Sequence, residues 1–304
     1  MKRIVIGAVF CLLCSVLFVC CTTKAQQAKV YGRYVPERKD DFAWENEYAA
    51  FRLYGQALKS ENPSNGVDLW LKNSPALVID TMYGRELKDH RPYHINYDGN
   101  LDCYKVGHSA GCGGLVIIAN DSMWIGGPYN RWEILEQTND KFTFRLTYDS
   151  IQVSTQWVCA ELTVTAEAGS PWNKAEVVLT NLSHAGVLPI VIELGGGIYT
   201  HDSMDNLWLS DAGNRIGYAE DALSDKQAAQ MNYDYNGSIS QGRAYIALFL
   251  SDAEHYGVFD NTLYLVRDYQ YGDTLTYWFA ACWSQWSDGN RSFPTDEDWF
   301  NAIK

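Results

Sequence analysis

The sequence contains 304 residues, of which 24 are lysine or arginine and 37 are aspartate or glutamate, so its formal net charge is −13. This excess of negative charge argues against nucleic acid and anionic membrane surfaces as partners. An anionic small molecule remains compatible with it, because a local cluster of arginine or lysine binds a carboxylate even in an acidic protein. Aromatic residues make up 14% of the chain, and such a surplus suits sugars, whose C–H faces stack on aromatic rings.

The first 25 residues have the pattern of an export signal. Lys2 and Arg3 precede an apolar run that ends at Cys21, and the segment around Ala25 fits a cleavage site. Cys20 or Cys21 as a lipid-modified first residue is the alternative, and a retained membrane anchor is a weaker one. We therefore expect an exported protein, either periplasmic or anchored to the outer membrane by a lipid, with residues 26–304 as one domain.

Four cysteines follow this signal, at positions 103, 112, 159 and 282. An even number of cysteines in an oxidising compartment is compatible with one or two disulfides, and Cys103 and Cys112 are close enough in sequence to pair. Buried free thiols are an equally good interpretation, because a chain of this size builds a core without cross-links. A zinc site is disfavoured, since no CxxC or HxxxH spacing occurs.

Strand patterns dominate the chain. Residues 40–58 fit either a helix or an extended arm. After them, short β-branched or aromatic runs bounded by Gly, Asn, Asp and Pro predict strands at 66–72, 76–83, 113–119, 142–149, 155–167, 174–183, 188–200, 244–250, 257–269 and 273–283. Short helices are expected at 221–231 and at 294–303, where Thr295 is a suitable N-cap. The pattern predicts an all-β protein, a large antiparallel β-sandwich with few short helices.

The run YHINYDGNLDCYKVGHSAGCGG, residues 93–114, concentrates groups that move protons. His94 follows Pro92 and should lie on a loop, with Tyr93 and Tyr97 close to it. Lys105 is expected in a strand, either pointing inward to hold a carboxylate or pointing outward into solvent. His108 lies beside the glycine-rich turn 111–114. That turn lacks the GK[ST] of a phosphate-binding loop and leads into a strand, so tight packing explains its glycines better.

Candidate residues also lie outside this run. His201 follows a strand with three consecutive glycines, which allow another group to approach the backbone closely. Arg52 stands among apolar neighbours and fits an internal salt bridge or a substrate clamp. Trp132, with its neighbours in MWIGGPYNRW, fits a sugar platform or a cleft wall. No cofactor is required by the sequence, although oxygen ligands at Asp40, Asp41, Glu45 and Asn46 leave a divalent cation open.

Four stretches together resemble the DUF4861 family of exported proteins of the Bacteroidota type. They are ERKDDFAWENEYAAFRLYG (37–55), NGVDLWLK (65–72), DGNLDCYKVGHSAGCGG (98–114) and AACWSQWSDG with the later DWF (280–300). The resemblance implies a mutarotase-like β-sandwich, a role in polysaccharide degradation and elimination chemistry at uronate ends of oligosaccharides. Tyr97 and Asn100 depart from the pattern, which has a histidine and an acidic residue there.

These observations lead us to expect a lyase or dehydratase that acts on uronate-containing oligosaccharides. Elimination needs a base, an acid and a cation that stabilises the carboxylate as charge develops on it. We expect His94 and His201 to share proton transfer with Tyr93 or Tyr97, and Lys105 and Arg52 to hold the carboxylate, with His108 and Trp132 as further substrate contacts. A glycoside hydrolase, which needs two carboxylates, and a non-catalytic glycan-binding sandwich remain open alternatives.

Overall fold

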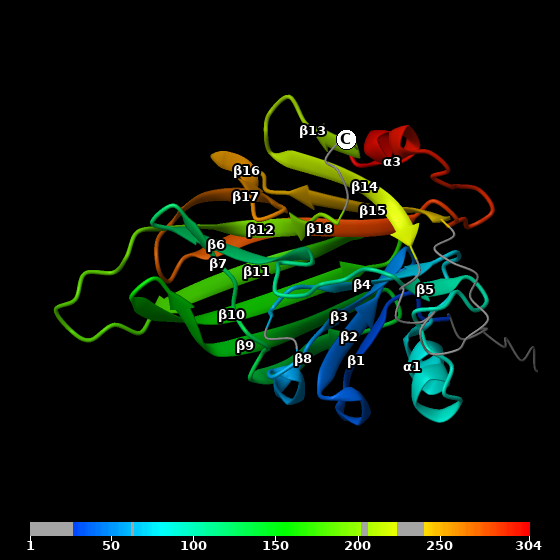
Figure 1. The fold of residues 1–304 in the computed structure, drawn as a ribbon, viewed down its shortest axis with the longest axis horizontal. Helices are drawn as coiled ribbons and strands as arrows, with labels where there is room; N and C mark the ends of the chain where they lie inside the picture. Colours follow the sequence, from blue (N-terminus) through cyan, green and yellow to red (C-terminus); the bar gives the residue numbers. More distant parts are fainter. Residues whose placement is uncertain (1–26, 62–63, 202–205, 224–239) are drawn as a thin grey trace, which may run out of the picture.

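The computed structural model describes residues 27–61, 64–201, 206–223 and 240–304, and in this part of the chain the strands form three antiparallel sheets (Figure 1). The first sheet has five strands, in the order β1 (Tyr31–Val35), β2 (Asp41–Glu45), β3 (Ala49–Leu53), β4 (Asp68–Lys72) and β5 (Asn100–Asp102). The predicted signal at 1–25 lies outside the described residues, so its boundary and the extent of the following domain stay predictions.

The second sheet is the largest. Its eight strands follow the order β13 (Leu207–Leu209), β14 (Arg215–Leu223), β15 (Ser240–Phe249), β18 (Thr274–Trp283), β11 (Trp172–Asn181), β10 (Gln156–Glu167), β9 (Lys141–Val153) and β8 (Arg131–Gln137). The third sheet has five, in the order β16 (His255–Phe259), β17 (Thr262–Tyr269), β12 (Ile192–Tyr199), β6 (Cys112–Ala119) and β7 (Ser122–Trp124).

The two five-stranded sheets pack on the same face of the eight-stranded sheet. Phe51 of β3 meets Phe279 of β18 edge to face, with ring centroids 5.6 Å apart. Gly196 of β12 lies so close to the same sheet that a Cβ atom there would come within 2.7 Å of Leu248 and Tyr277. The main hydrophobic core fills the space between these layers. This arrangement confirms the predicted fold class, an all-β antiparallel sandwich.

Four short helical segments complete the described fold: η1 (Pro36–Arg38), η2 (Gln56–Leu58), α1 (Ile79–Lys88) and α3 (Asp296–Ala302). Helix α3 covers the opposite face of the eight-stranded sheet, where Trp299 stacks on Tyr245 at 5.9 Å (Figure 1). Thr295 caps it through a reciprocal pair of hydrogen bonds with Asp298, as its sequence indicates. None of the described helices combines the length and the apolar character that a membrane span requires.

Most predicted strands overlap a strand of the structure, and four predicted segments differ from it. Residues 257–269 form two strands, because Asp260 and Asn261 turn the chain with φ values of 43° and 60°. The segment 40–58 is not a helix but the hairpin of β2 and β3, so the extended interpretation is correct. The predicted helix at 221–231 starts within β14 and then lies outside the described residues.

The strand predicted at 76–83 is wrong, since this segment begins α1. Ile79, Met82 and Tyr83 lie at helical spacing and are buried against the outer face of the first sheet. The carboxylate of Glu45 accepts hydrogen bonds from the main-chain N–H groups of Val78 and Ile79 at 2.9 Å and 3.0 Å. Because this acceptor comes from β2, the local pattern does not reveal the helix.

Glu45 also forms a fully buried ion pair. The ammonium group of Lys72, on β4, lies 3.0 Å from the Glu45 carboxylate and 2.7 Å from the main-chain oxygen of Asn46. Burial lowers the pKa of Lys72, and the charge of Glu45 opposes this effect. One carboxylate thus joins two strands of the first sheet to the start of α1.

We predict that Glu45→Ala lowers the free energy of unfolding by roughly 3–5 kcal/mol, because it leaves a buried ammonium without its counterion. Urea unfolding measures this change. Glu136→Ala is the matched control, since Glu136 pairs with Lys141 at 2.9 Å on the surface and should contribute less than about 1 kcal/mol. Equal losses in both variants would contradict the structural role given to Glu45.

Candidate functional site

The segment 102–105, which begins at the last residue of β5, brings together the two histidines that are distant in sequence. Nδ1 of His94 lies 3.1 Å from the main-chain oxygen of Asp102. Nε2 of His201 lies 2.5 Å from the main-chain oxygen of Lys105. These two contact points are three residues apart, so their Cα atoms are at most about 11 Å from each other. His94 and His201 therefore lie against one short stretch of backbone.

His94 offers a lone pair to a ligand. A carbonyl oxygen only accepts hydrogen bonds, so Nδ1 of His94 carries the proton and Nε2 of the neutral ring is unprotonated. The side chain is 38% exposed, and the Asp102 carboxylate lies 3.7 Å from Nδ1. The ring of Tyr93 meets the imidazole edge to face at 4.8 Å. This arrangement has the form of a general base with a carboxylate behind it.

Arg52 anchors the other side of Asp102. Its guanidinium is buried and donates to Asp68 at 2.8 Å, to the Tyr93 hydroxyl at 3.1 Å and to Asp102 at 3.2 Å. Asp41 lies 3.5 Å from the same group. The salt-bridge interpretation thus describes Arg52, and with 3% of its surface exposed it cannot contact a substrate in this arrangement.

The three aspartates around Arg52 outnumber its charge, and this affects their protonation. Burial and the neighbouring Asp68 raise the pKa of Asp102 to about 7, against the opposing effects of His94 and Arg52. Burial likewise raises the pKa of Asp41 to about 6, although Arg52 and Arg38 oppose it. Asp102 and Asp41 therefore take up a proton at a higher pH than an exposed aspartate does.

His201 is occupied at both ring nitrogens. Nδ1 lies 2.9 Å from the Glu220 carboxylate of β14, while Nε2 contacts the Lys105 main-chain oxygen. Burial lowers the pKa of His201, but the hydrogen bond and the charge of Glu220 outweigh burial, so the net shift is upward. Tyr104 and Tyr199 pack edge to face on the imidazole. Through these two hydrogen bonds, His201 joins Glu220 of β14 to the main chain of segment 102–105.

The remaining predicted residues of this region lie at different depths. Tyr93 is buried, and its hydroxyl also accepts a hydrogen bond from Arg38 at 3.2 Å. Tyr97 is partly exposed, and the guanidinium of Arg91 lies 4.1 Å from its ring centroid. Lys105 is exposed between the buried residues Tyr104 and Val106. The alternation of burial expected there is present, but the strand predicted to contain Lys105 is wrong, because β5 ends at Asp102 and residues 103–106 are irregular.

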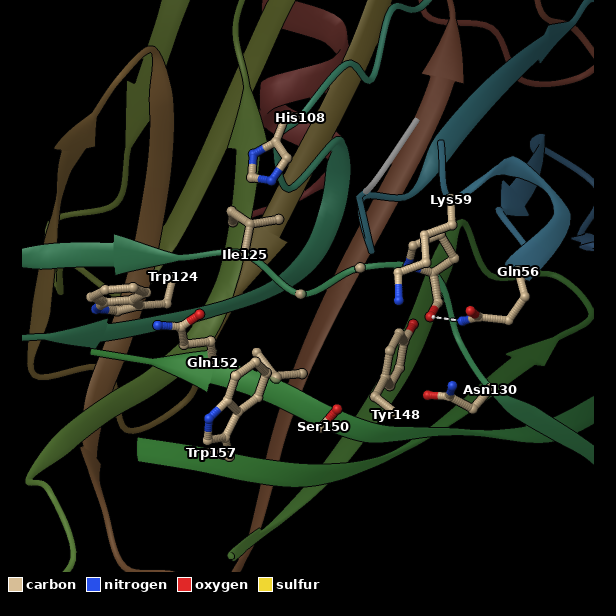
Figure 2. Close-up of a pocket in the computed structure, with 14 residues that line it drawn as sticks. Gln56, Lys59, His108, Trp124, Ile125, Asn130, Tyr148, Ser150, Gln152 and Trp157 are labelled. Carbon is tan, nitrogen blue, oxygen red and sulfur yellow. Dashed lines mark hydrogen bonds between the residues drawn. The ribbon is translucent and has the colours of Figure 1, made fainter. Parts of the chain in front are cut away.

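Trp132 and His108 lie apart from the histidine pair. Trp132 is on β8, 41% exposed, and stacks on Tyr34 with ring centroids 5.0 Å apart. His108 lines a separate cavity of about 470 Å³, shown in Figure 2. Residues from η2, the β7–β8 connection and strands β9 and β10 form the rest of this cavity. Of the predicted residues, His108 reaches it, and so does Trp124 of the stretch MWIGGPYNRW.

An irregularity in β9 shapes the floor of this cavity. Ile151 pairs with Val158, but Tyr148 pairs with Ala160, so β9 contains one extra residue there. Before this bulge the even positions of β9 are buried, and after it Ile151 and Val153 are buried instead. The switch leaves Ser150 and Gln152 exposed at the cavity, next to the buried Tyr148.

The acidic residues considered for a cation are used by protein partners. Asp41 pairs with arginines, Glu45 with Lys72, and Asp40 accepts a hydrogen bond from Tyr34 at 2.5 Å. Within the described ranges, no group of three or more His, Cys, Asp or Glu side chains is arranged to hold a metal ion. The cysteines at 103, 112, 159 and 282 are all free thiols, so the pairing of Cys103 with Cys112 is not seen.

Sequence reasoning missed three residues that the structure places at these sites. Glu220 sits in a strand whose end resembles a helix, and nothing local marks it as the partner of His201. Lys59 and Trp157 line the cavity with His108. Trp157 is the second residue of β10, in which buried and more exposed positions alternate, and it lies on the exposed side. A tryptophan at an exposed position is the one signal in the sequence that could have identified it.

The fold and this site together define an antiparallel β-sandwich protein with two histidine–carboxylate pairs, His94 with Asp102 and His201 with Glu220, that contact the segment 102–105. The chain belongs to the family described as domain of unknown function DUF4861, whose model matches residues 19–304. The resemblance of the four sequence stretches is thereby confirmed.

Two further similarities were found. Uncharacterized protein P7 of Formosa agariphila is 24% identical over 284 residues, which cover 90% of this chain and 66%, just under two thirds, of that protein. The galactosidase domain of alpha-galactosidase-sucrose kinase AgaSK matches 83% of this chain and 41% of its own, with 11% identity and a TM-score of 0.36. A score this low supports no inference about fold or activity.

We predict that Glu220→Gln lowers the pKa of His201. The glutamine keeps a hydrogen-bond acceptor but removes the charge, so one of the effects that oppose burial is lost. A proton NMR titration of the imidazole resonances measures the shift. An unchanged His201 titration in the variant would show that Glu220 does not set its charge.

We also predict that stability falls as pH rises from about 4 to about 7. The raised pKa of Asp102 means that the folded protein keeps a proton that the unfolded chain has released in this window. Each such group contributes a slope of up to roughly 1.4 kcal/mol per pH unit, and Asp41 and His201 act in the same direction. Asp102→Asn should make the slope shallower in urea unfolding, whereas the exposed control Asp149→Asn should keep it.

Proposed function

We propose that this protein is a carbohydrate-active enzyme that catalyses β-elimination at uronate-containing oligosaccharides. The observation that carries the proposal is the ring of His94, whose Nδ1 is fixed on the Asp102 main-chain oxygen while the half-exposed ring presents a basic Nε2. Elimination starts with removal of the proton at C5 of the sugar, next to its carboxylate, and a positioned imidazole is suited to this step.

Asp102 supports the charge that His94 acquires. When Nε2 takes the proton, the ring becomes an imidazolium whose Nδ1–H faces the Asp102 carboxylate at 3.7 Å. Arg52 and Tyr93 act as positioning residues, because the guanidinium holds both Asp102 and the tyrosine hydroxyl. Arg52, which we expected to contact the substrate, is therefore assigned to the positioning of the base His94.

Lys105 is the cation that we assign to the substrate carboxylate. It is exposed on the same segment, and His201 holds its main-chain oxygen at 2.5 Å. His201 is assigned to positioning rather than to proton transfer, since neither of its nitrogens offers a lone pair in this arrangement. A positive charge at this point stabilises the enediolate that forms when C5 loses its proton.

Tyr97 is assigned as the acid that completes the reaction. It is the partly exposed tyrosine of the loop that carries His94, while Tyr93 is buried. As the bond between C4 and its oxygen breaks, the leaving oxygen takes the phenolic proton and a C4=C5 double bond forms. The proton on His94 then returns through solvent to the tyrosine, so that both groups are restored.

Hydrolysis by a pair of carboxylates is less well supported. Of the candidate acids in the described residues, Glu45, Asp68 and Asp102 are buried against Lys72 or Arg52. Asp98 pairs with Arg85, and Glu193 with His255. A hydrolase would need two of these groups free to face the sugar.

We predict that His94→Ala lowers the rate of elimination by about 10²–10⁴-fold, the usual contribution of a general base. The rate is followed by the ultraviolet absorbance of the double bond in products from oligosaccharides that end in glucuronate, iduronate or galacturonate. The melting temperature should change little, because the side chain is 38% exposed.

His184→Ala is the matched control, since His184 is an exposed histidine on the loop between β11 and β12. It should keep both the rate and the melting temperature of the unmodified protein. No absorbance change with any of these three uronates, or a full rate in His94→Ala, would refute the elimination mechanism. Release of a saturated sugar instead would favour hydrolysis.

A further inference from the structure

The cavity next to His108 has the composition of a ligand site rather than of a packing defect. Its volume of about 470 Å³ falls in the range of small-molecule sites. Figure 2 shows Trp124, Gln152 and Trp157 at one end and Gln56, Lys59, Asn130 and Tyr148 at the other. The cavity therefore offers aromatic faces at one end and polar groups at the other.

The tryptophan end is open to solvent. Trp157 is 48% exposed and pairs across the β9–β10 ladder with Gln152. The indole of Trp124 is fixed by a hydrogen bond to the main-chain oxygen of Ala119 at 3.2 Å. Exposed indoles beside an amide offer apolar faces and hydrogen-bonding edges together, which is what the C–H face and the hydroxyl groups of a sugar require.

The charge of the cavity is opposite to that of the protein. The chain contains 37 aspartate and glutamate residues, yet none of them is among the 14 residues that line the cavity. Lys59 and His108 are the titratable basic residues of the lining, and neither forms a salt bridge with a carboxylate of the described residues. In an acidic protein, such a lining favours an anion.

Tyr148 provides an unused hydrogen-bonding group. The residue is 2% exposed, and its hydroxyl has no hydrogen-bond partner within the described part of the chain. A buried hydroxyl without a partner costs roughly 1–3 kcal/mol. A ligand hydroxyl in the cavity would remove this penalty.

We propose that this cavity binds an anionic saccharide, with the sugar ring against Trp157 and Trp124 and its acidic group at Lys59 and His108. The acidic group is a carboxylate or a sulfate ester, since both offer several oxygen acceptors to an ammonium and an imidazole. The Tyr148 hydroxyl and the amide of Gln152 bind sugar hydroxyls.

This binding site does not depend on the elimination reaction proposed for His94. The segment that carries His108 also carries Asp102, six residues earlier, so the two Cα atoms are at most about 22 Å apart. A short oligosaccharide held in the cavity can extend along this segment toward His94. The cavity would then select acidic chains, while a different part of the molecule performs the chemistry.

Titration calorimetry with three disaccharides tests the proposal. The disaccharides end in glucuronate, in glucose or in glucose 6-sulfate and are otherwise the same. We expect saturable binding of at least one acidic disaccharide, at least about tenfold tighter than that of the neutral one. The tighter of the two acidic ligands identifies the group that Lys59 and His108 recognise.

Variants locate the binding. Trp157→Ala should weaken the acidic ligand at least about tenfold, and Lys59→Met should reduce its affinity to that of the neutral disaccharide. Trp132→Ala and Lys141→Met are matched controls outside the cavity and should bind as the unmodified protein does. His94→Ala should also keep full binding, so loss of elimination and loss of binding are separable.

Several results would overturn the proposal: no saturable binding of either acidic disaccharide, equal binding of the neutral one, or full binding in both Trp157→Ala and Lys59→Met. An equal loss in Trp157→Ala and Trp132→Ala would likewise place the sugar elsewhere. Circular dichroism of each variant separates a lost site from a lost fold.

Discussion

The guanidinium of Arg52 is the interaction on which the candidate site depends. Four neighbouring strands meet at it, because Asp41 lies on β2, Arg52 on β3, Asp68 on β4 and Asp102 at the end of β5. Removing one partner from such a buried group leaves uncompensated charge. The same arginine holds the hydroxyl of Tyr93, so the loop that carries His94 is fixed to the sheet by one side chain.

Much of the fold follows from local pattern, and the failures have a common physical cause. Alternating strands such as β9 and β10 bury one face, and their period of two is visible in the sequence. The first sheet is buried on both faces, so Asp41, Glu45 and Arg52 interrupt the expected alternation with charges inside. Their counterions come from other strands, and so does the carboxylate that starts α1. No local window contains this information.

The candidate site could be predicted only in part from the sequence, because the partners of its residues also come from distant segments. The histidines at 94 and 201 and the lysine at 105 are recognisable as residue types beside glycine-rich turns. What each one does depends on its partners: the Asp102 main-chain oxygen leaves His94 a lone pair, while Glu220 and the Lys105 main-chain oxygen occupy both ring nitrogens of His201. Burial decides which of the other residues can contact a substrate, since Arg52 and Tyr93 are buried and Lys105 is exposed.

The extra residue in β9 has a consequence for relatives of this protein. Because side chains alternate along a strand, deletion of one residue between Tyr148 and Ile151 would restore the regular alternation and leave Ile151 and Val153 buried. The strand would then expose one residue at this point, where it now exposes both Asp149 and Ser150. An alignment gap of one residue here would mark family members whose cavity floor lacks this local widening, without any change in the residues that follow.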